Sequence, residues 1–581
     1  MAKPKMTPGR AKKRIGAALL ICLGLWFGAA SPAFAQPFAH RGHAPASQKA
    51  AANGLAGILG YISRGWESLT RSLGECKTYA DEKAIGKPLL YLPAGVAEPA
   101  MLEHLETQCG VAVRHLPEPI RKPGEKAASA IEPPGLLYLP HPYVVPGGRF
   151  NEMYGWDSYF ILRGLLLDGK IRLARGIVEN FFYEIEHYGM VLNANRTYYL
   201  TRSQPPFLSA MILAVYDSEK AAGRDDLAWL RKAYPYAVRY YDFWTHGAHL
   251  AGSTGLSRFY DFGSGPAPEV MASSPQYYRY VAAYFVRHPA AARGFLDWVP
   301  NGDSGVRPVG PLFTVSVCKP SPVVSRRDCD SAGRVGLTAK FYKGDRSLRE
   351  SGFDVTFRFG PFGADTPDYA PVGLNSLLYE SARDLERMSR LLGRPKEAQR
   401  WARLAAQRQE NIRRYLWNAK RGLFFDYDFV TKRQSSYVFA TTFYPLWAGL
   451  ASTNQAHAVA ANAKLFLEPG GLVTSLRPSL AQWDYPYGWA PLQLIAAEGL
   501  RRYGYNEDAD RISYRFLGTV LENFRRDGTI REKYNVVTRS SDVSVRAGYR
   551  QNVIGFGWTN GVFLALLKEM PESWRARLAG D

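Results

Sequence analysis

Apolar residues recur at helical spacing over most of the chain. Between 371 and 392, for example, leucines and a methionine mark one face, while Glu380, Arg383 and Arg387 point elsewhere. Such spacing of three and four residues is typical of helices that bury one face. It predicts helices over 170–188, 207–221, 226–246, 371–392, 395–416, 437–450, 454–466, 488–503 and 507–524. Strand signals are short, at 89–93 and 137–139.

Long loops alternate with these helices. Every second loop is rich in polar and aromatic residues: 146–157, 190–206, 255–275, 350–365, 477–489 and 530–558. A closed ring of helix pairs would produce this series if the loops at one mouth held the functional site.

The stretch from 146 to 160 reads PGGRFNEMYGWDSYF. Its glycines allow a tight turn, and Arg149 offers a planar fork of hydrogen-bond donors. Trp156 and Asp157 precede the apolar run 159–167, so a capped helix with a core tryptophan is the structural alternative. A core does not require an arginine, Glu152 and a Trp-Asp pair on one loop, so the set indicates a functional site.

This stretch resembles the first signature of the trehalases, PGGRF-x-E-x-Y-x-WDSYF. Residues 482–493, QWDYPYGWAPLQ, resemble the second. Further matches are KTYAD at 77–81, NANRTYYLTRSQPPF at 193–207, ESGFD at 350–354, EKYNV at 532–536 and GFGWTNGV at 555–562. The resemblance implies an all-α (α/α)6 barrel, in agreement with the alternation of helices and long loops.

Composition narrows the class of protein further. The 581 residues are 46% hydrophobic and carry a formal charge of +21. Beyond the N-terminus the basic residues are dispersed among acids, which favours a solvated surface over nucleic-acid binding. Length and hydrophobic content allow a large core.

The first 35 residues have a basic start, an apolar stretch from Ile15 to about Ala30, and Ala-Phe-Ala before Gln36. This pattern predicts a signal peptide cleaved after Ala35, and hence a periplasmic or secreted protein. An uncleaved anchor is the alternative, but the apolar run is short for a membrane span. No stable membrane anchor is therefore expected, and a monomer is expected.

The domain boundaries follow from composition. Residues 36–66 are rich in small and polar residues and are predicted to be a poorly ordered lead-in. Residues 67–575 are predicted to form the catalytic barrel. An insertion relative to the family is predicted at about 288–343, where the chain turns rich in Pro, Gly and Ser, either as a lid or as a passive surface excursion.

Four cysteines remain after the predicted signal peptide, an even number in an exported chain. Three pairings are possible. Cys318 with Cys329 closes a short loop and is favoured, which leaves Cys76 with Cys109. Four free buried thiols are the alternative.

Hydrolysis of a glycosidic bond uses two carboxyl groups, one to protonate the leaving oxygen and one to activate water or attack carbon. Asp354 lies among aromatic residues, which would exclude water and raise its pKa, as a general acid requires. Glu532 adjoins Lys533, whose charge favours the carboxylate form of a base. The resemblance assigns the acid to Asp354 and the base to Glu532. It also implies inversion, for which the carboxyls lie roughly 6.5–9.5 Å apart, whereas retention demands a shorter gap.

Sugar recognition uses planar donors, carboxylates and aromatic faces. The resemblance places substrate-binding positions at Arg149, Trp156, Asp157, Asn193, Arg202, Ser203, Gln204, Ala267, Pro268, Glu269, Gly352, Arg358, Trp483, Asp484, Tyr549 and Trp558. No metal site is predicted, because the histidines never fall at ligand spacing with acids or cysteines, and no phosphate-binding glycine loop occurs. No cofactor is expected.

Three positions depart from the trehalase pattern. Ala267 stands where the family has the arginine of an Arg-Pro-Glu triplet, and Tyr549 where it has a sugar-binding glutamate. Gly373 replaces a usual aspartate. None of these is a catalytic carboxylate, so the departures bear on substrate choice; Arg550 or Gln551 could substitute for the lost contact.

The sequence predicts a glycoside hydrolase that cleaves trehalose, a small sugar, into two glucose molecules. The rivals are a glycosidase of the same fold with another di- or oligosaccharide substrate, a phosphorylase, and a sugar-binding protein without turnover. The presence of both Asp354 and Glu532 argues against the last.

Overall fold

The computed structural model describes residues 54–80, 83, 86–126, 130–292, 294–299, 314–318, 332–479, 481–548 and 552–580. Contacts divide the chain into units 1–48 and 49–581, and every described residue belongs to the second unit.

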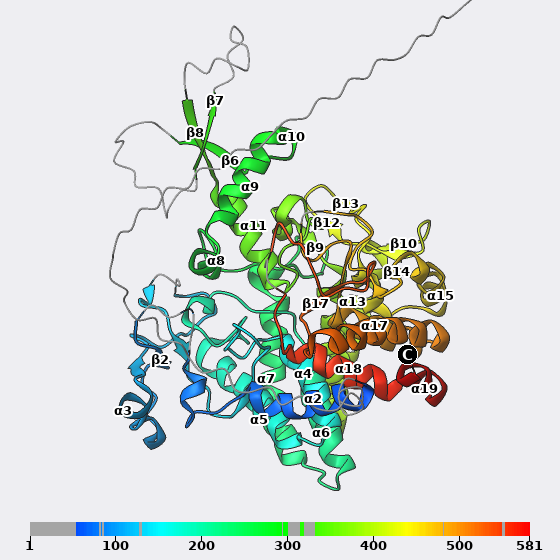
Figure 1. Cartoon of the computed structure of the whole chain (residues 1–581), viewed down its shortest axis with the longest axis horizontal. Helices are drawn as coiled ribbons and strands as arrows, with labels where there is room; N and C mark the ends of the chain where they lie inside the picture. Colours follow the sequence, from blue (N-terminus) through cyan, green and yellow to red (C-terminus); the bar gives the residue numbers. More distant parts are fainter. Residues whose placement is uncertain are drawn as a thin grey trace, which may run out of the picture. The chain divides into compact units, whose positions relative to one another are not determined.

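In the described part of the chain, six helices form a closed inner ring in which each packs against the next. Some of them are labelled in Figure 1. In order they are α4 (Asp157–Leu167), α6 (Leu208–Ala221), α12 (Val372–Leu391), α14 (Tyr444–Trp447), α16 (Ala490–Arg502) and α18 (Gly557–Glu569). The ring closes where α18 packs along α4. Protein surrounds these helices, and α4 and α18 are accordingly buried on nearly every side.

A second layer of helices covers the ring. In this layer α5 (Ile171–Tyr188) packs against α4, and α7 (Leu227–Thr245) packs against α6. Likewise, α13 (Pro395–Tyr415) packs against α12, and α17 (Asn506–Asp527) packs against α16. α15 (Thr453–Asn462) follows α14, and α2 (Leu55–Leu69) packs on α17 and α18, with α19 (Glu572–Gly580) also on α17. The predicted all-α (α/α)6 barrel is confirmed.

Glycines allow α4 and α18 to approach closely. A Cβ added at Gly561 would stand 2.0 Å from the carbonyl oxygen of Phe160, and one at Gly164 would stand 2.6 Å from the Cα of Gly561. A side chain at either position would push the two helices apart. The closure of the ring therefore depends on backbone contact.

The predicted lead-in at 36–66 needs a correction, because helix α2 begins at Leu55. Ile58, Ile62 and Trp66 recur every four residues and are buried, and the indole of Trp66 donates a 2.7 Å hydrogen bond to Asp168. The small and polar residues before this helix led to the prediction of poor order for the whole range, although its last part is an amphipathic helix that packs on α17 and α18. The other domain boundaries remain predictions.

Shorter elements join the barrel helices. The remaining helices are α3 (Leu105–Cys109), α8 (Pro268–Ser273), α9 (Gln276–Arg287), α10 (Pro289–Ala292) and α11 (Ala339–Glu350). Antiparallel pairs are β1 (Thr70–Arg71) with β5 (Tyr143–Val144), β10 (Trp417–Asn418) with β11 (Leu423–Phe424), β14 (Leu467–Glu468) with β15 (Gly471–Leu472), and β16 (Tyr487–Trp489) with β17 (Lys533–Asn535). A three-stranded antiparallel sheet has the order β13 (Arg433–Gln434), β12 (Tyr427–Asp428), β9 (Tyr369–Ala370).

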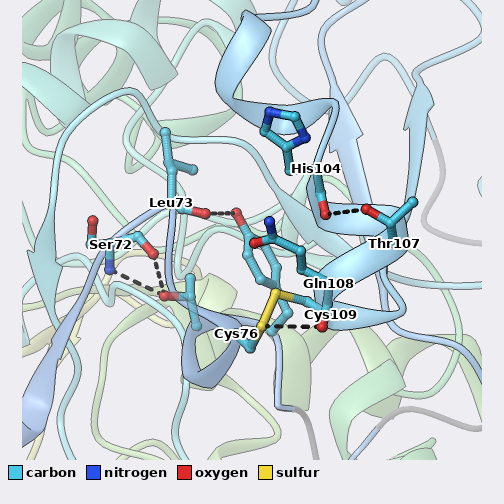
Figure 2. The surroundings of a disulfide bond; sticks show 9 residues. Ser72, Leu73, Cys76, His104, Thr107, Gln108 and Cys109 are labelled. Carbon is cyan, nitrogen blue, oxygen red and sulfur yellow. Dashed lines mark hydrogen bonds between the residues drawn. A yellow bond between two sulfur atoms is a disulfide. The ribbon is translucent and has the colours of Figure 1, made fainter.

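A small parallel sheet lies ahead of the barrel, with β2 (Leu89–Leu92) between β3 (Ala112–His115) and β4 (Leu136–Leu137). The strand signal at 89–93 corresponds to β2, whereas the signal at 137–139 overlaps β4 only at Leu137. Beside it, a disulfide joins Cys76 to Cys109 at the end of α3, with a Cα–Cα distance of 5.0 Å (Figure 2).

The region predicted as an insertion contains an antiparallel sheet in the order β6 (Leu296–Val299), β8 (Ala332–Leu337), β7 (Thr314–Cys318). Cys329 lies outside the described residues, so its bond with Cys318 stays a prediction. Across the residues described here, no helix combines the length and apolarity that a membrane crossing requires.

Candidate active site

A cavity of about 530 Å³ opens where the long loops meet the ring. Each of the six predicted loops contributes at least one residue to the lining of this cavity, and Arg349 directly precedes one of them. The lining residues are Pro146, Phe150, Tyr154, Trp156, Asp157, Asn193, Tyr199, Arg202, Gln204, Glu269, Arg349, Gly352, Asp354, Gln482, Trp483, Trp489, Glu532, Phe556 and Trp558.

Asp354 follows the end of α11 and faces this cavity. Burial raises the pKa of its carboxyl group to about 7, although the guanidinium of Arg349 opposes the rise. The Nη1 atom of Arg349 lies 3.5 Å from Oδ2 of Asp354. A carboxyl group with this pKa carries a proton for much of the time near neutral pH, so Asp354 can act as a general acid.

Glu532 reaches the same cavity from the loop that precedes β17. It is buried, and the ammonium group of the buried Lys533 donates a 2.7 Å hydrogen bond to its Oε2. The indole of Trp558 donates a 3.2 Å hydrogen bond to its backbone oxygen. Its position is therefore fixed by β17 and by the start of α18.

Asp157, the first residue of α4, lies close enough to both carboxyl groups to interact with them. Burial raises its pKa well above the usual range, and the charges of Glu532 and Asp354 raise it further. The cavity thus brings together acids from three distant parts of the chain. This arrangement suits reactions that transfer protons at a bond held between carboxyl groups.

Aromatic rings form one side of the cavity. The rings of Trp483 and Trp489 stack with centroids 3.7 Å apart, and Trp156 and Trp558 meet edge to face at 5.7 Å. Phe353, next to Asp354, packs against Trp156 at 5.4 Å. These rings exclude water from the acid and offer apolar faces to a ligand.

A buried ion-pair network forms another side. The guanidinium of Arg202 donates hydrogen bonds to Glu269 at 2.6 Å, Asp261 at 2.8 Å and Asn193 at 3.3 Å. Burial raises the pKa of Glu269, but Arg202 and Arg349 outweigh it and hold that pKa below its usual value. Glu269 is therefore a charged hydrogen-bond acceptor at the cavity wall.

Some predicted substrate contacts do not reach the lining of this cavity. Ser203 donates a 2.6 Å hydrogen bond to the backbone oxygen of Val191. Arg358 is buried against Asp426, its Nε 2.6 Å from Oδ2. Asp484 accepts hydrogen bonds from Thr356, Phe357 and Ser479. These side chains hold loops in place, and their contact with a substrate stays a prediction.

Two of the three departures from the trehalase pattern, Ala267 and Gly373, also lie away from the lining. Ala267 is buried, its N–H donates a 2.7 Å hydrogen bond to Tyr278, and Pro268 begins α8. Gly373 faces Thr441 and Tyr444 rather than the cavity. Tyr549 lies outside the described residues, as do its neighbours 550 and 551. Arg149 lines a neighbouring cavity instead.

The structure adds lining residues that were not singled out from the sequence: Pro146, Phe150, Tyr154, Tyr199, Arg349, Gln482, Trp489 and Phe556. All but Arg349 lie inside the quoted motifs, and Arg349 directly precedes ESGFD. Among the residues that the structure describes, no three His, Cys, Asp or Glu side chains are grouped to hold a metal ion.

Comparison with known proteins agrees with the resemblance of the sequence motifs to the trehalases. The sequence profile of the family described as Trehalase matches residues 101–285 and 328–571. Cytosolic neutral trehalase of Saccharomyces cerevisiae is 34% identical over 573 residues, covering 88% of this chain and 71% of that protein. That of Neurospora crassa is 33% identical over 569 residues, covering 86% and 71%. The solved structure of neutral trehalase Nth1 from Saccharomyces cerevisiae has a TM-score of 0.71 at 32% identity, covering 90% of this chain and 96% of that chain.

These names contradict the predicted export of the protein. Relatives that match over most of the chain are named as cytosolic, so the prediction of a signal peptide and of a periplasmic or secreted location is wrong by this comparison. A basic start followed by a short apolar stretch is a feature of composition, and it does not by itself establish that a segment is cleaved. Residues 1–35 lie outside the described residues.

Proposed function

The chain belongs to the trehalase family of glycosidases, and from this membership we propose that it hydrolyses the α,α-1,1 bond of trehalose by an inverting two-carboxylate mechanism. The observation that carries the mechanism is that Asp354 and Glu532 line one cavity in different environments. Burial raises the pKa of Asp354 to about 7, whereas Glu532 accepts a hydrogen bond from the ammonium group of Lys533. Such a division of environments separates an acid from a base.

In the proposed reaction, Asp354 protonates the glycosidic oxygen of the leaving glucose. Glu532 removes a proton from a water molecule as that water attacks the anomeric carbon from the opposite face. The water supplies the new hydroxyl group and inverts the configuration at this carbon. The tryptophans around the cavity exclude other water and pack against the sugar.

Sugar hydroxyl groups are proposed to bind the polar wall. Arg202 and Asn193 offer donors, and the charged carboxylate of Glu269 offers acceptors between them. Gln204 is held by a 3.0 Å hydrogen bond from the backbone N–H of Trp156 to its side-chain oxygen. Its amide nitrogen can then donate to a ligand.

Two substitutions test the assignment of the carboxyls. Asp354→Asn and Glu532→Gln are each expected to lower kcat for trehalose by roughly 10²- to 10⁴-fold, because each removes a proton-transfer group without changing its size. Glucose release measures the effect, and calorimetric titration with trehalose checks that binding remains.

Matched controls are available on the surface. Asp217→Asn and Glu522→Gln change exposed carboxylates that pair with Arg387 and Arg539 and do not line the catalytic cavity, and they should leave turnover unchanged. Near wild-type turnover in either site variant would refute the role given to that residue.

A further inference from the structure

A second cavity of about 810 Å³ adjoins the catalytic cavity. Both cavities are lined by Phe150, Tyr154, Tyr199, Glu269 and Arg349, so they share a wall or an opening. The outer cavity alone is lined by Lys83, Arg149, Tyr198, Val270, Ala272 and Ser273. Its outer edge is the short helix α8, on which Ala272 and Ser273 are exposed.

Lys83, Arg349 and Glu269, which are charged side chains on its walls, are bound to other protein groups. The ammonium of Lys83 lies 2.7 Å from the buried Glu152. Arg349 donates hydrogen bonds to Asp345 at 3.1 Å, and Glu269 is bound by Arg202 at 2.6 Å. An anionic ligand would compete with carboxylates already in place. A neutral ligand with many hydroxyl groups could bond to the outer faces of these groups without displacing them.

Aromatic side chains complete the walls. Tyr198 and Tyr199 meet edge to face with ring centroids 4.6 Å apart, and Phe150 and Tyr154 do so at 5.5 Å. The guanidinium of Arg149 lies 5.5 Å from the ring of Phe150. Apolar ring faces beside planar donors suit a sugar, which has C–H faces and a rim of hydroxyl groups.

The position of this cavity indicates which part of a substrate would enter it. Arg349 lines the outer cavity and also contacts Asp354, the proposed acid. Glu532, Trp558 and Asp157 line only the catalytic cavity. A general acid stands beside the leaving oxygen, so the outer cavity adjoins the leaving glucose.

We propose that the outer cavity is a subsite for a third, neutral sugar unit carried by the leaving glucose. This rests on the proposed hydrolysis of trehalose. A suitable substrate is trehalose with an α-1,4-glucosyl unit on one of its glucoses. Water adds across the α,α-1,1 bond, the leaving oxygen takes the proton of Asp354, and Glu532 takes a proton from the water, so the products are glucose and maltose.

Filling the outer cavity tests the subsite. Ala272→Trp and, independently, Ser273→Trp should lower kcat/KM for the trisaccharide by at least about tenfold and change kcat/KM for trehalose by less than about twofold. Ala228→Trp, at an exposed position on α7, is the matched control and should change neither. Chromatography of glucose and maltose reads out the reaction.

The outcomes separate the subsite from the proposed function. Failure of the wild-type protein to cleave the trisaccharide while it cleaves trehalose would overturn the subsite alone, as would an equal loss for both substrates in the Ala272 and Ser273 variants. If trehalose 6-phosphate were instead cleaved faster than trehalose, and the tryptophan variants removed that gain, the subsite would be for an anion. Inactivity on trehalose would contradict the proposed function itself.

Discussion

Arg349 links the proposed acid to the sugar-binding wall. Its side chain lies 3.5 Å from Asp354 and 3.8 Å from Glu269, and it is held by Asp345. Burial raises the pKa of Asp354, and the positive charge of Arg349 limits that rise, so this residue contributes to where the acid titrates.

The pH dependence of activity should report this interaction. The general acid works in its protonated form, so kcat/KM should fall as the pH rises through about 7, the pKa of Asp354. Arg349→Met removes a charge that lowers this pKa, so the fall should move to higher pH, whereas Arg349→Lys keeps the charge and should largely restore it. A profile of kcat/KM from acid to alkaline pH is the measurement. If kcat/KM of Arg349→Met falls at the same pH as in the unmodified protein, a group other than Asp354 controls this fall.

The sequence motifs predict which segments form the site, but not which side chains of a segment face the cavity. Gln482, Trp483 and Asp484 are consecutive in one signature, yet the first two line the cavity and the third turns to Thr356 and Ser479. A motif marks the neighbourhood of a site. It does not separate residues that face the ligand from those that hold the loop, because that depends on contacts with residues distant in sequence.

At the scale of elements, amphipathic helices were predicted well. The ranges expected for 371–392 and 395–416 agree with α12 and α13 to within one residue at each end, since each helix has a polar and a buried face. α18 was not predicted, because this helix is buried nearly all round and shows little periodicity. α2 was missed because of the composition before it.

The contact between α4 and α18 should be sensitive to a single methyl group. Gly561→Ala would place a Cβ 2.0 Å from the carbonyl oxygen of Phe160, so the helices must separate, and we expect a loss of about 1–3 kcal/mol in the free energy of unfolding. Denaturant unfolding measures it.

A glycine on an outer helix is the matched control. Gly518 in α17 has only the tip of Arg539 at 3.6 Å and Leu578 at 3.9 Å near an added Cβ. Gly518→Ala should therefore stabilise the protein by roughly 0.5–1 kcal/mol. Equal effects of the two substitutions would contradict the close packing described for the ring.

At the scale of the whole molecule, the alternation of helices and long loops was enough to predict a ring with one functional mouth. Five of the six loops precede an inner helix that begins at that mouth, as α4 does at Asp157 and α18 at Gly557. The cysteine pairing and the cellular location depend on information outside this pattern. The pairing was predicted from the spacing of the cysteines and the location from the pattern of the first 35 residues, and the location was wrong by comparison with the relatives.

The Cys76–Cys109 bond should contribute to global stability. It joins residues 33 apart, and a loop of this length corresponds to about 3–4 kcal/mol in the chain-entropy model. Reduction should therefore lower Tm in calorimetry. The double variant Cys76→Ser with Cys109→Ser should already have the lower Tm, and any response to reductant that remains in it would come from the predicted Cys318–Cys329 bond. An unchanged Tm in the double variant would contradict the contribution given to Cys76–Cys109.

The central claim is that Asp354 and Glu532 cleave trehalose with inversion, and proton NMR during hydrolysis tests it most directly. The signals of the anomeric protons distinguish α- from β-glucose before the two forms interconvert. Inversion predicts equal initial amounts of both, because water attack gives β-glucose while the leaving glucose stays α. Initial release of α-glucose alone would contradict the account, since it would indicate retention through a glycosyl-enzyme, and no release of glucose at all would contradict the proposed activity.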